Sequence, residues 1–204
     1  VHCTRDGVLI AFHDDRLDRV TNQKGRIQKL NYVDVACARV DNCEPIPLME
    51  ELLGDFPEAR FNIDPKSDAA VQPLIEIIKR TASEDRVCVG SFSDHRLRQI
   101  RSALPQVCTS MATYEAARAK LNSLGVRLGS LSANCAQVPV RWNGVSVVDR
   151  RFIQTMKGQG IPVHVWTIND ASEMHRLLDM GVDGIMTDRP SVLKAVLLER
   201  GSWN

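Results

Sequence analysis

Short apolar runs typical of β-strands alternate with helical patterns along almost the whole chain, and this alternation constrains the fold more than any other feature. The strand-like runs cover residues 60–63, 86–92, 107–111, 145–148, 162–168 and 184–187. Parallel strands joined by crossover helices produce this pattern, so we expect an α/β barrel or an open doubly wound sheet. The length of 204 residues suits one sizeable core, and we expect a single domain over residues 1–204.

The helical patterns have recognisable ends. Apolar residues recur at helical spacing over residues 68–81, and Ser93 is placed to cap the next helix. Asp170, with a glutamate three residues later, resembles a capping box, and Gly181 supplies the stop of that helix. Pro190 suits the first turn of a last helix. We therefore expect these helices to be specified locally.

Charge and cysteine content limit the partners and the compartment. A net charge of +1 gives no overall attraction to nucleic acid, and no apolar run reaches the roughly 18 residues of a membrane span. The six cysteines are scattered without a CxxC pair, so we interpret them as reduced thiols and predict a cytoplasmic protein. We expect a small-molecule ligand, no nucleic acid and no membrane span, and the sequence leaves the oligomeric state open.

Polar and aromatic residues stand where strand-like runs end. The chain has neither a GxGxxG nor a GxxxxGK[ST] loop, so nucleotide binding of those kinds is disfavoured. In a barrel the carboxyl ends of the strands surround one mouth, which houses catalysis. The residues at these positions are His13, Asp14, Asp64, Ser91, Phe92, Trp166, Thr187 and Asp188.

Five ordered blocks carry a family resemblance. Residues 4–14 read TRDGVLIAFHD, with RVT at 19–21 and Gly25, and they resemble the T-x-D-G-x-x-V-x-x-H-D…R-T-T…G block of the glycerophosphodiester phosphodiesterases. Residues 46–53, 61–66, 165–169 and 181–190 are similar to the family's later blocks, in the same order. The resemblance therefore covers nearly the whole chain.

The resemblance implies a TIM barrel that hydrolyses glycerophosphodiesters to sn-glycerol 3-phosphate and an alcohol, using Mg²⁺ or Ca²⁺. It implies that His13 is a catalytic histidine that protonates the leaving alcohol, and that Asp64 is a metal carboxylate. Lys66 matches the family's phosphate-facing lysine, and Phe92 and Trp166 match apolar wall positions near the glycerol. The chemistry agrees, because a phosphodiester monoanion needs charge neutralisation and a proton for the departing oxygen. Histidine ordinarily titrates near pH 6.5 and can supply that proton.

The chain also departs from the family pattern. The family's first strand ends in His-Arg-Gly, and its second strand contributes E-x-D immediately before the position of Val1; neither motif is present. Asp64 stands where the family has a glutamate. We therefore expect the chain to be part of a longer polypeptide, with the first strand and helix outside it. Without those residues we expect the chain as given to be inactive, since two metal carboxylates would be missing.

Alternatives stay open. A lysophospholipase D acting on lipids, a phospholipase-C-like enzyme with a cyclic product, and an inactive barrel serving as a binding or structural module share this fold. The residues alone also allow structural interpretations. Residue 13 would then be a loop histidine, residue 64 a helix cap and residue 66 a solvated lysine. Aromatic side chains at 92 and 166 are as often barrel core as substrate wall. We expect His2 to have no partner. We assign structural roles to it and to the other remaining histidines, His95, His164 and His175.

Overall fold

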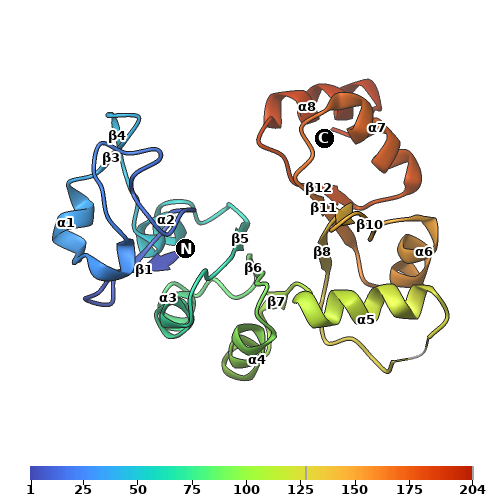
Figure 1. The fold of residues 1–204 in the computed structure, drawn as a ribbon, viewed down its shortest axis with the longest axis horizontal. Helices are drawn as coiled ribbons and strands as arrows, with labels where there is room; N and C mark the ends of the chain where they lie inside the picture. Colours follow the sequence, from blue (N-terminus) through green and yellow to red (C-terminus); the bar gives the residue numbers. More distant parts are fainter. Residues whose placement is uncertain (127, 204) are drawn as a thin grey trace. The chain divides into compact units, whose positions relative to one another are not determined.

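A computed structural model describes residues 1–126 and 128–203, and it divides the chain into two compact units, Val1–Thr109 and Ser110–Asn204 (Figure 1). The helices and strands of the first unit are β1 (His2–Cys3), β2 (Leu9–Ile10), α1 (Tyr32–Ala36), β3 (Arg39–Val40), β4 (Glu44–Pro45), α2 (Met49–Asp55), β5 (Phe61–Ile63), α3 (Val71–Arg80), β6 (Val87–Val89), α4 (Asp94–Ala103) and β7 (Cys108–Thr109). Short 3₁₀ turns lie at Ile27–Lys29 and Asp68–Ala70. The expectation of one domain over the whole chain stays a prediction.

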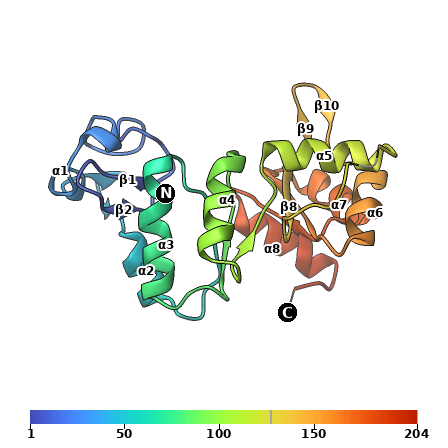
Figure 2. The ribbon, with the colours of Figure 1, turned by 90° about the horizontal axis from the view of Figure 1, so that it is seen from below.

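The first unit is built on a parallel sheet of β5, β6 and β7. Phe61 lies opposite Val87, and Cys88 lies opposite Cys108. Helix α3 connects β5 to β6 and packs beside α4, which connects β6 to β7 (Figure 2). The carboxyl ends of the three strands therefore share one edge, from which Asp64 emerges.

An antiparallel hairpin of β1 and β2 precedes this sheet. Its turn uses Gly7 at φ +90°, a conformation that favours glycine. The nitrogen of Val1 donates to the carbonyl of Asp64 at 2.7 Å, and the nitrogen of Lys66 donates to the carbonyl of Val1 at 3.1 Å. Val1 thus bonds to Asp64 and to Lys66, the residues on either side of Pro65. This is the hydrogen-bond pattern of parallel strands. The opening strand is thus fixed against the carboxyl end of β5.

The long loop after β2 is ordered by its own small core. Its buried residues are Ile10, Leu17, Ile27, Val35, Ala38 and Ile46. Burial of aliphatic side chains contributes roughly 25 cal/mol per Å² of apolar surface, so this cluster stabilises a loop that has little regular structure. The backbone between His13 and Gly25 is therefore anchored at both ends.

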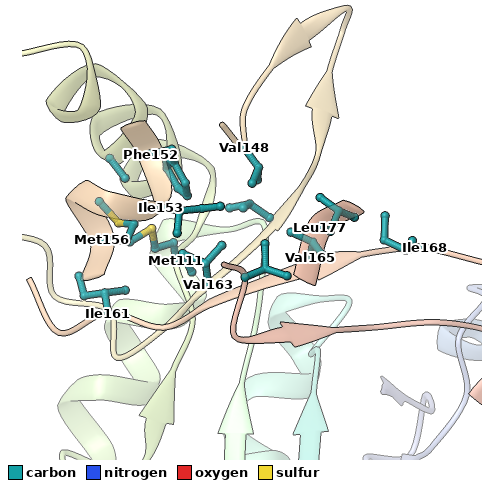
Figure 3. Close-up of a cluster of buried hydrophobic side chains, with 14 of the residues drawn as sticks. Met111, Val148, Phe152, Ile153, Met156, Ile161, Val163, Val165, Ile168 and Leu177 are labelled. Atoms are coloured by element: carbon teal, nitrogen blue, oxygen red, sulfur yellow. The ribbon is translucent and has the colours of Figure 1, made fainter. Parts of the chain in front are cut away.

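The second unit contains α5 (Thr113–Ser123), β8 (Ala136–Pro139), β9 (Arg141–Trp142), β10 (Val145–Ser146), α6 (Arg150–Gly158), β11 (Val163–Trp166), α7 (Ala171–Met180), β12 (Gly184–Ile185) and α8 (Pro190–Glu199). Strands β8, β11 and β12 form a parallel sheet with β11 in the middle. Side chains of β11 and α6 meet in a buried core (Figure 3) that includes Val163, Val165, Phe152, Ile153 and Met156.

The helix ends predicted from the sequence are confirmed. The carboxylate of Asp170 accepts the N–H of Glu173 at 2.9 Å, and Gly181 ends α7 at φ +99°. The hydroxyl of Ser93 accepts the N–H of Arg96 at 3.4 Å at the start of α4. Pro190 is the first residue of α8. Among the described residues, no helix combines the length and hydropathy required to cross a membrane.

One predicted parallel strand is wrong. The run at 145–148 supplies only β10, the second strand of an antiparallel hairpin in which Val145 faces Trp142. Asn143 and Gly144 both have positive φ, as a tight two-residue hairpin turn requires. The parallel strand is β8, whose alternating buried and half-buried residues pair in register with β11.

Asp149 joins two helices of the second unit. One carboxylate oxygen caps α6 by accepting the N–H of Phe152 at 2.9 Å, and the other accepts the ammonium of Lys120 on α5 at 2.5 Å. Partial burial raises the pKa of Asp149, but the hydrogen bonds from Lys120 and Phe152 outweigh it and hold the pKa below its usual range. The ionised carboxylate therefore stabilises the folded unit.

We expect Asp149→Ala to lower the free energy of unfolding by about 1–2 kcal/mol, the usual contribution of a helix cap. Because the folded pKa lies below the unfolded one, this contribution is present above the ordinary carboxyl pKa and lost as pH falls through the folded value. Urea unfolding followed by tryptophan fluorescence measures it, since all three tryptophans lie in the second unit. Asp149→Asn, which keeps a capping oxygen but loses the ion pair, should lie in between. Equal midpoints for the parent and the alanine variant would contradict the expectation.

Candidate active site

His13 follows β2 and presents its imidazole to solvent. The side chain is 79% exposed, and its Nδ1 lies 2.8 Å from Oδ1 of Asp14. The backbone carbonyl of His13 accepts a hydrogen bond from Nε2 of His2 at 3.0 Å. His2 is itself buried, so the backbone at position 13 is fixed while its ring remains accessible. The expectation that His2 has no partner is wrong, because the hairpin folds its ring back onto this carbonyl.

Arg19 holds the carboxylate of Asp14 with two hydrogen bonds. Its Nε lies 2.5 Å from Oδ2 and its Nη2 lies 3.0 Å from Oδ1, the two-pronged geometry that arginine makes with carboxylates. The hydrogen bonds from Arg19, and secondly from His13, hold the pKa of Asp14 well below its usual range. Asp14 is therefore a carboxylate at every pH at which the protein would work.

Asp64 and Lys66 follow β5 at its carboxyl end. The Nζ of Lys66 lies 2.8 Å from Oδ2 of Asp64, and both side chains are partly exposed. Arg96 on α4 holds the segment that leads from β5 to α3. Its Nη1 donates to the carbonyl of Pro65 at 3.1 Å, and its Nε donates to the carboxylate of Asp68 at 2.6 Å. Proline restricts the residue before it to an extended backbone, which suits Asp64 at a strand end.

A pocket of about 500 Å³ is lined by both His13, which follows the opening hairpin, and Lys66, which follows β5. The side chains that line it are His2, His13, Asp14, Asp15, Arg16, Asp18, Arg19 and Lys66. Asp64 does not line the pocket itself but is bonded to Lys66, which does. Three of the residues singled out from the sequence thus lie at one end of the first unit.

The two aromatic candidates belong to other strands of the chain. Phe92 follows β6, is 55% exposed, and is absent from the described residues that line this pocket. Trp166 is the last residue of β11 in the second unit and is half-buried. Their assignment to the substrate wall stays a prediction.

Asp14 and Arg19, which contact one another beside His13, have no role assigned from the sequence. Both stand inside the first family-like block, with HD at 13–14 and Arg19 opening RVT, so a signal was present. Their contact depends on how the loop folds back over five residues, which no periodicity encodes.

The donor set around Asp64 fits one ligand of a hard divalent cation. A carboxylate oxygen at a strand end is the kind of donor that Mg²⁺ and Ca²⁺ take, and these ions need about six or more oxygens. In residues 1–126 and 128–203, no gathering of three His, Cys, Asp or Glu ligand atoms includes Asp64. Asp64 therefore fits as one ligand of such a cation.

Solved structures define the class of fold. The chain is similar to an Oleispira antarctica phosphodiesterase solved in complex with the product sn-glycerol-3-phosphate, with a TM-score of 0.78 and 20% identity over 97% of this chain and 82% of that one. It is also similar to a glycerophosphodiester phosphodiesterase of Parabacteroides distasonis, with a TM-score of 0.77 and 23% identity over 98% and 82%. The fold is therefore an α/β fold of the TIM-barrel phosphodiesterase type, as predicted.

The sequence comparison gives the family. A model of the "Glycerophosphoryl diester phosphodiesterase family" matches residues 1–192, and the chain belongs to that family. It is 37% identical over 210 residues to a Mycobacterium tuberculosis protein named "Probable glycerophosphodiester phosphodiesterase 2", covering 100% of this chain and 80% of that protein. The resemblance of the five blocks is thereby confirmed, and the protein is an enzyme of the phosphodiesterase class.

Proposed function

We propose that the protein hydrolyses glycerophosphodiesters to sn-glycerol 3-phosphate and an alcohol, with a requirement for Mg²⁺ or Ca²⁺. The observation that carries this proposal is the pocket that collects His13 and Lys66, with Asp64 bonded to Lys66. The family match and the names of the relatives, one of them solved with sn-glycerol-3-phosphate, support the same substrate class.

The side chains divide the chemistry between them. Lys66 places a positive charge beside the phosphate oxygens of the substrate. Asp64 would hold the divalent cation, which supplies further charge neutralisation when bound. In the net reaction the oxygen of water bonds to phosphorus, and the phosphorus–alcohol bond breaks with its electron pair remaining on the alcohol oxygen. His13 gives that oxygen its proton, the attacking water releases one proton to solvent, and His13 regains a proton from solvent when the products leave.

Phe92 and Trp166 complete the proposal as apolar walls beside the glycerol. Their positions support this role: each follows or ends a parallel strand, where barrel enzymes carry their substrate contacts. The six cysteines, which form no disulfide in the described residues, support a cytoplasmic location. The family match supports a role in glycerol and lipid metabolism.

The test is an assay of the full-length protein. With glycerophosphocholine as substrate we expect release of sn-glycerol 3-phosphate, abolished by a chelator and restored by added Mg²⁺ or Ca²⁺. Activity that persists in excess chelator would contradict the metal requirement. No turnover of any phosphodiester would favour the binding-module alternative.

One further substrate and one further measurement separate the related activities. Release of lysophosphatidate from lysophosphatidylcholine at a higher rate than turnover of glycerophosphocholine would favour the lysophospholipase D alternative. Phosphorus NMR of the reaction mixture distinguishes a lasting cyclic phosphate from the open monoester. A persistent cyclic product would overturn the hydrolysis as proposed.

A further inference from the structure

We propose that Asp14, held by Arg19, is the positioning residue that fixes the protonation geometry of His13. The inference rests on the proposed function, in which His13 donates a proton to the leaving alcohol. It assigns to Asp14 the task of keeping Nδ1 of the imidazole protonated and occupied, so that Nε2 is the nitrogen that meets the substrate.

The contact between Nδ1 of His13 and Oδ1 of Asp14 needs one proton, and only the imidazole can supply it. Asp14 is ionised, so both of its oxygens can only accept hydrogen bonds. The 2.8 Å contact with His13 therefore requires a proton on Nδ1. With Nδ1 protonated, the Nε2 atom of the neutral ring carries a lone pair. The Nε2 atom of the charged ring carries a proton that can be transferred. Only the Nε2 proton is then available to the substrate, because the Nδ1 proton is shared with Asp14.

The support behind Asp14 is fixed as well. Arg19 takes both carboxylate oxygens, and a monodentate cation would leave the carboxylate free to rotate. The loop that carries Arg19 is closed by the N–H of Leu17 on the carbonyl of Gly25 and by the N–H of Gly25 on Asp18, both at 3.0 Å. The side chain of Asp14 is 21% exposed against 79% for His13. The arrangement is a fixed acceptor beneath an accessible ring.

The backbone carbonyl of His13 is restrained as well. Nε2 of the buried His2 donates to it at 3.0 Å, so both the main chain and the ring of His13 have a fixed partner. A positioned acid needs a restrained backbone as well as a restrained ring, since rotation about either one moves Nε2. The structure therefore separates the two tasks between His2 and Asp14.

The experiment uses the full-length protein with ¹⁵N-labelled histidine and glycerophosphocholine as substrate. In the parent we expect the ¹⁵N shifts of His13 to report the Nδ1–H tautomer. In Asp14→Ala the Nε2–H tautomer should become populated, and kcat should fall while KM stays close to the parent value. We expect a loss of about 10²-fold, smaller than the roughly 10⁴-fold from the orienting aspartate of a buried Ser-His-Asp triad, because His13 is largely exposed.

Variants of the arginine test the chain of contacts. Arg19→Ala should lower kcat in the same direction as Asp14→Ala, and Arg19→Lys should restore part of the loss because it keeps the charge but not the two-pronged contact. Arg26→Ala is the matched control: Arg26 pairs with Asp15 at 3.1 Å in the same loop and does not contact Asp14. We expect this control to keep the parent kcat and tautomer.

The two proposals fail in different ways. An unchanged tautomer and an unchanged kcat in Asp14→Ala, in a protein that hydrolyses glycerophosphocholine and loses activity in His13→Ala, would overturn the positioning role alone. A parent protein without hydrolysis, or an active His13→Ala variant, would overturn the proposed function. In that event the tautomer measurement still decides whether Asp14 orients His13.

Discussion

Replacing His13 by alanine is expected to lower kcat for glycerophosphocholine by about 10²- to 10⁴-fold, the usual contribution of a positioned general acid. The imidazole is mostly exposed, so its removal creates no cavity in the core and the fold should persist. The measurement is a steady-state assay of sn-glycerol 3-phosphate release, with circular dichroism to show that the variant is folded.

A change of leaving group tests whether His13 acts as a proton donor. A p-nitrophenolate ion departs without needing a proton, so a p-nitrophenyl phosphodiester should be cleaved by His13→Ala with a much smaller loss than glycerophosphocholine. A merely structural defect would slow both substrates equally. His95→Ala is the control, because His95 is an exposed histidine on α4 outside this pocket. Full activity in His13→Ala with glycerophosphocholine would contradict the assignment.

The part of the fold that could be predicted is the part with local causes. Asp170 caps a helix through a hydrogen bond to a residue three positions away, and Gly181 ends it through its own backbone angle, so a short stretch of sequence contains both signals. Strand β8 was missed for a tertiary reason. Its four residues, AQVP, become a strand only by pairing with β11, whereas the apolar run at 145–148 belongs to a hairpin.

The candidate site divides in the same way. His13 and Asp64 could be singled out because strand ends are visible in the sequence, and Lys66 because of the family resemblance; the roles of all three stay predictions. The two-pronged contact between Arg19 and Asp14, and the bond from His2 to the carbonyl of His13, depend on how a hairpin and a loop close in space. The periodicity of apolar residues does not report such contacts, because they join polar atoms of the side chains and the backbone.

Replacing Asp64 by asparagine is expected to raise the Mg²⁺ or Ca²⁺ concentration for half-maximal activity by more than about 100-fold. Residues that only support a metal ligand contribute about 10- to 100-fold, and Asp64 is proposed as a ligand itself. The substitution keeps the shape of the side chain and removes its charge, which at about 4 Å is worth on the order of 4 kcal/mol at an effective dielectric of 20. Titration of activity with each cation, and calorimetric titration of the metal into the full-length protein, measure the effect.

Two neighbouring substitutions separate ligation from general electrostatics. Asp64→Glu introduces the residue that the family carries at this position, and we expect it to keep metal affinity close to the parent value. Asp68→Asn removes an equal charge four residues away, from a side chain that pairs with Arg96 and is 71% exposed, and we expect it to leave metal affinity unchanged. If Asp64→Asn and Asp68→Asn weakened the cation equally, the effect would come from net charge and Asp64 would not be a ligand. A loss confined to Asp64→Asn and absent from Asp64→Glu requires a carboxylate at the end of β5 that touches the ion.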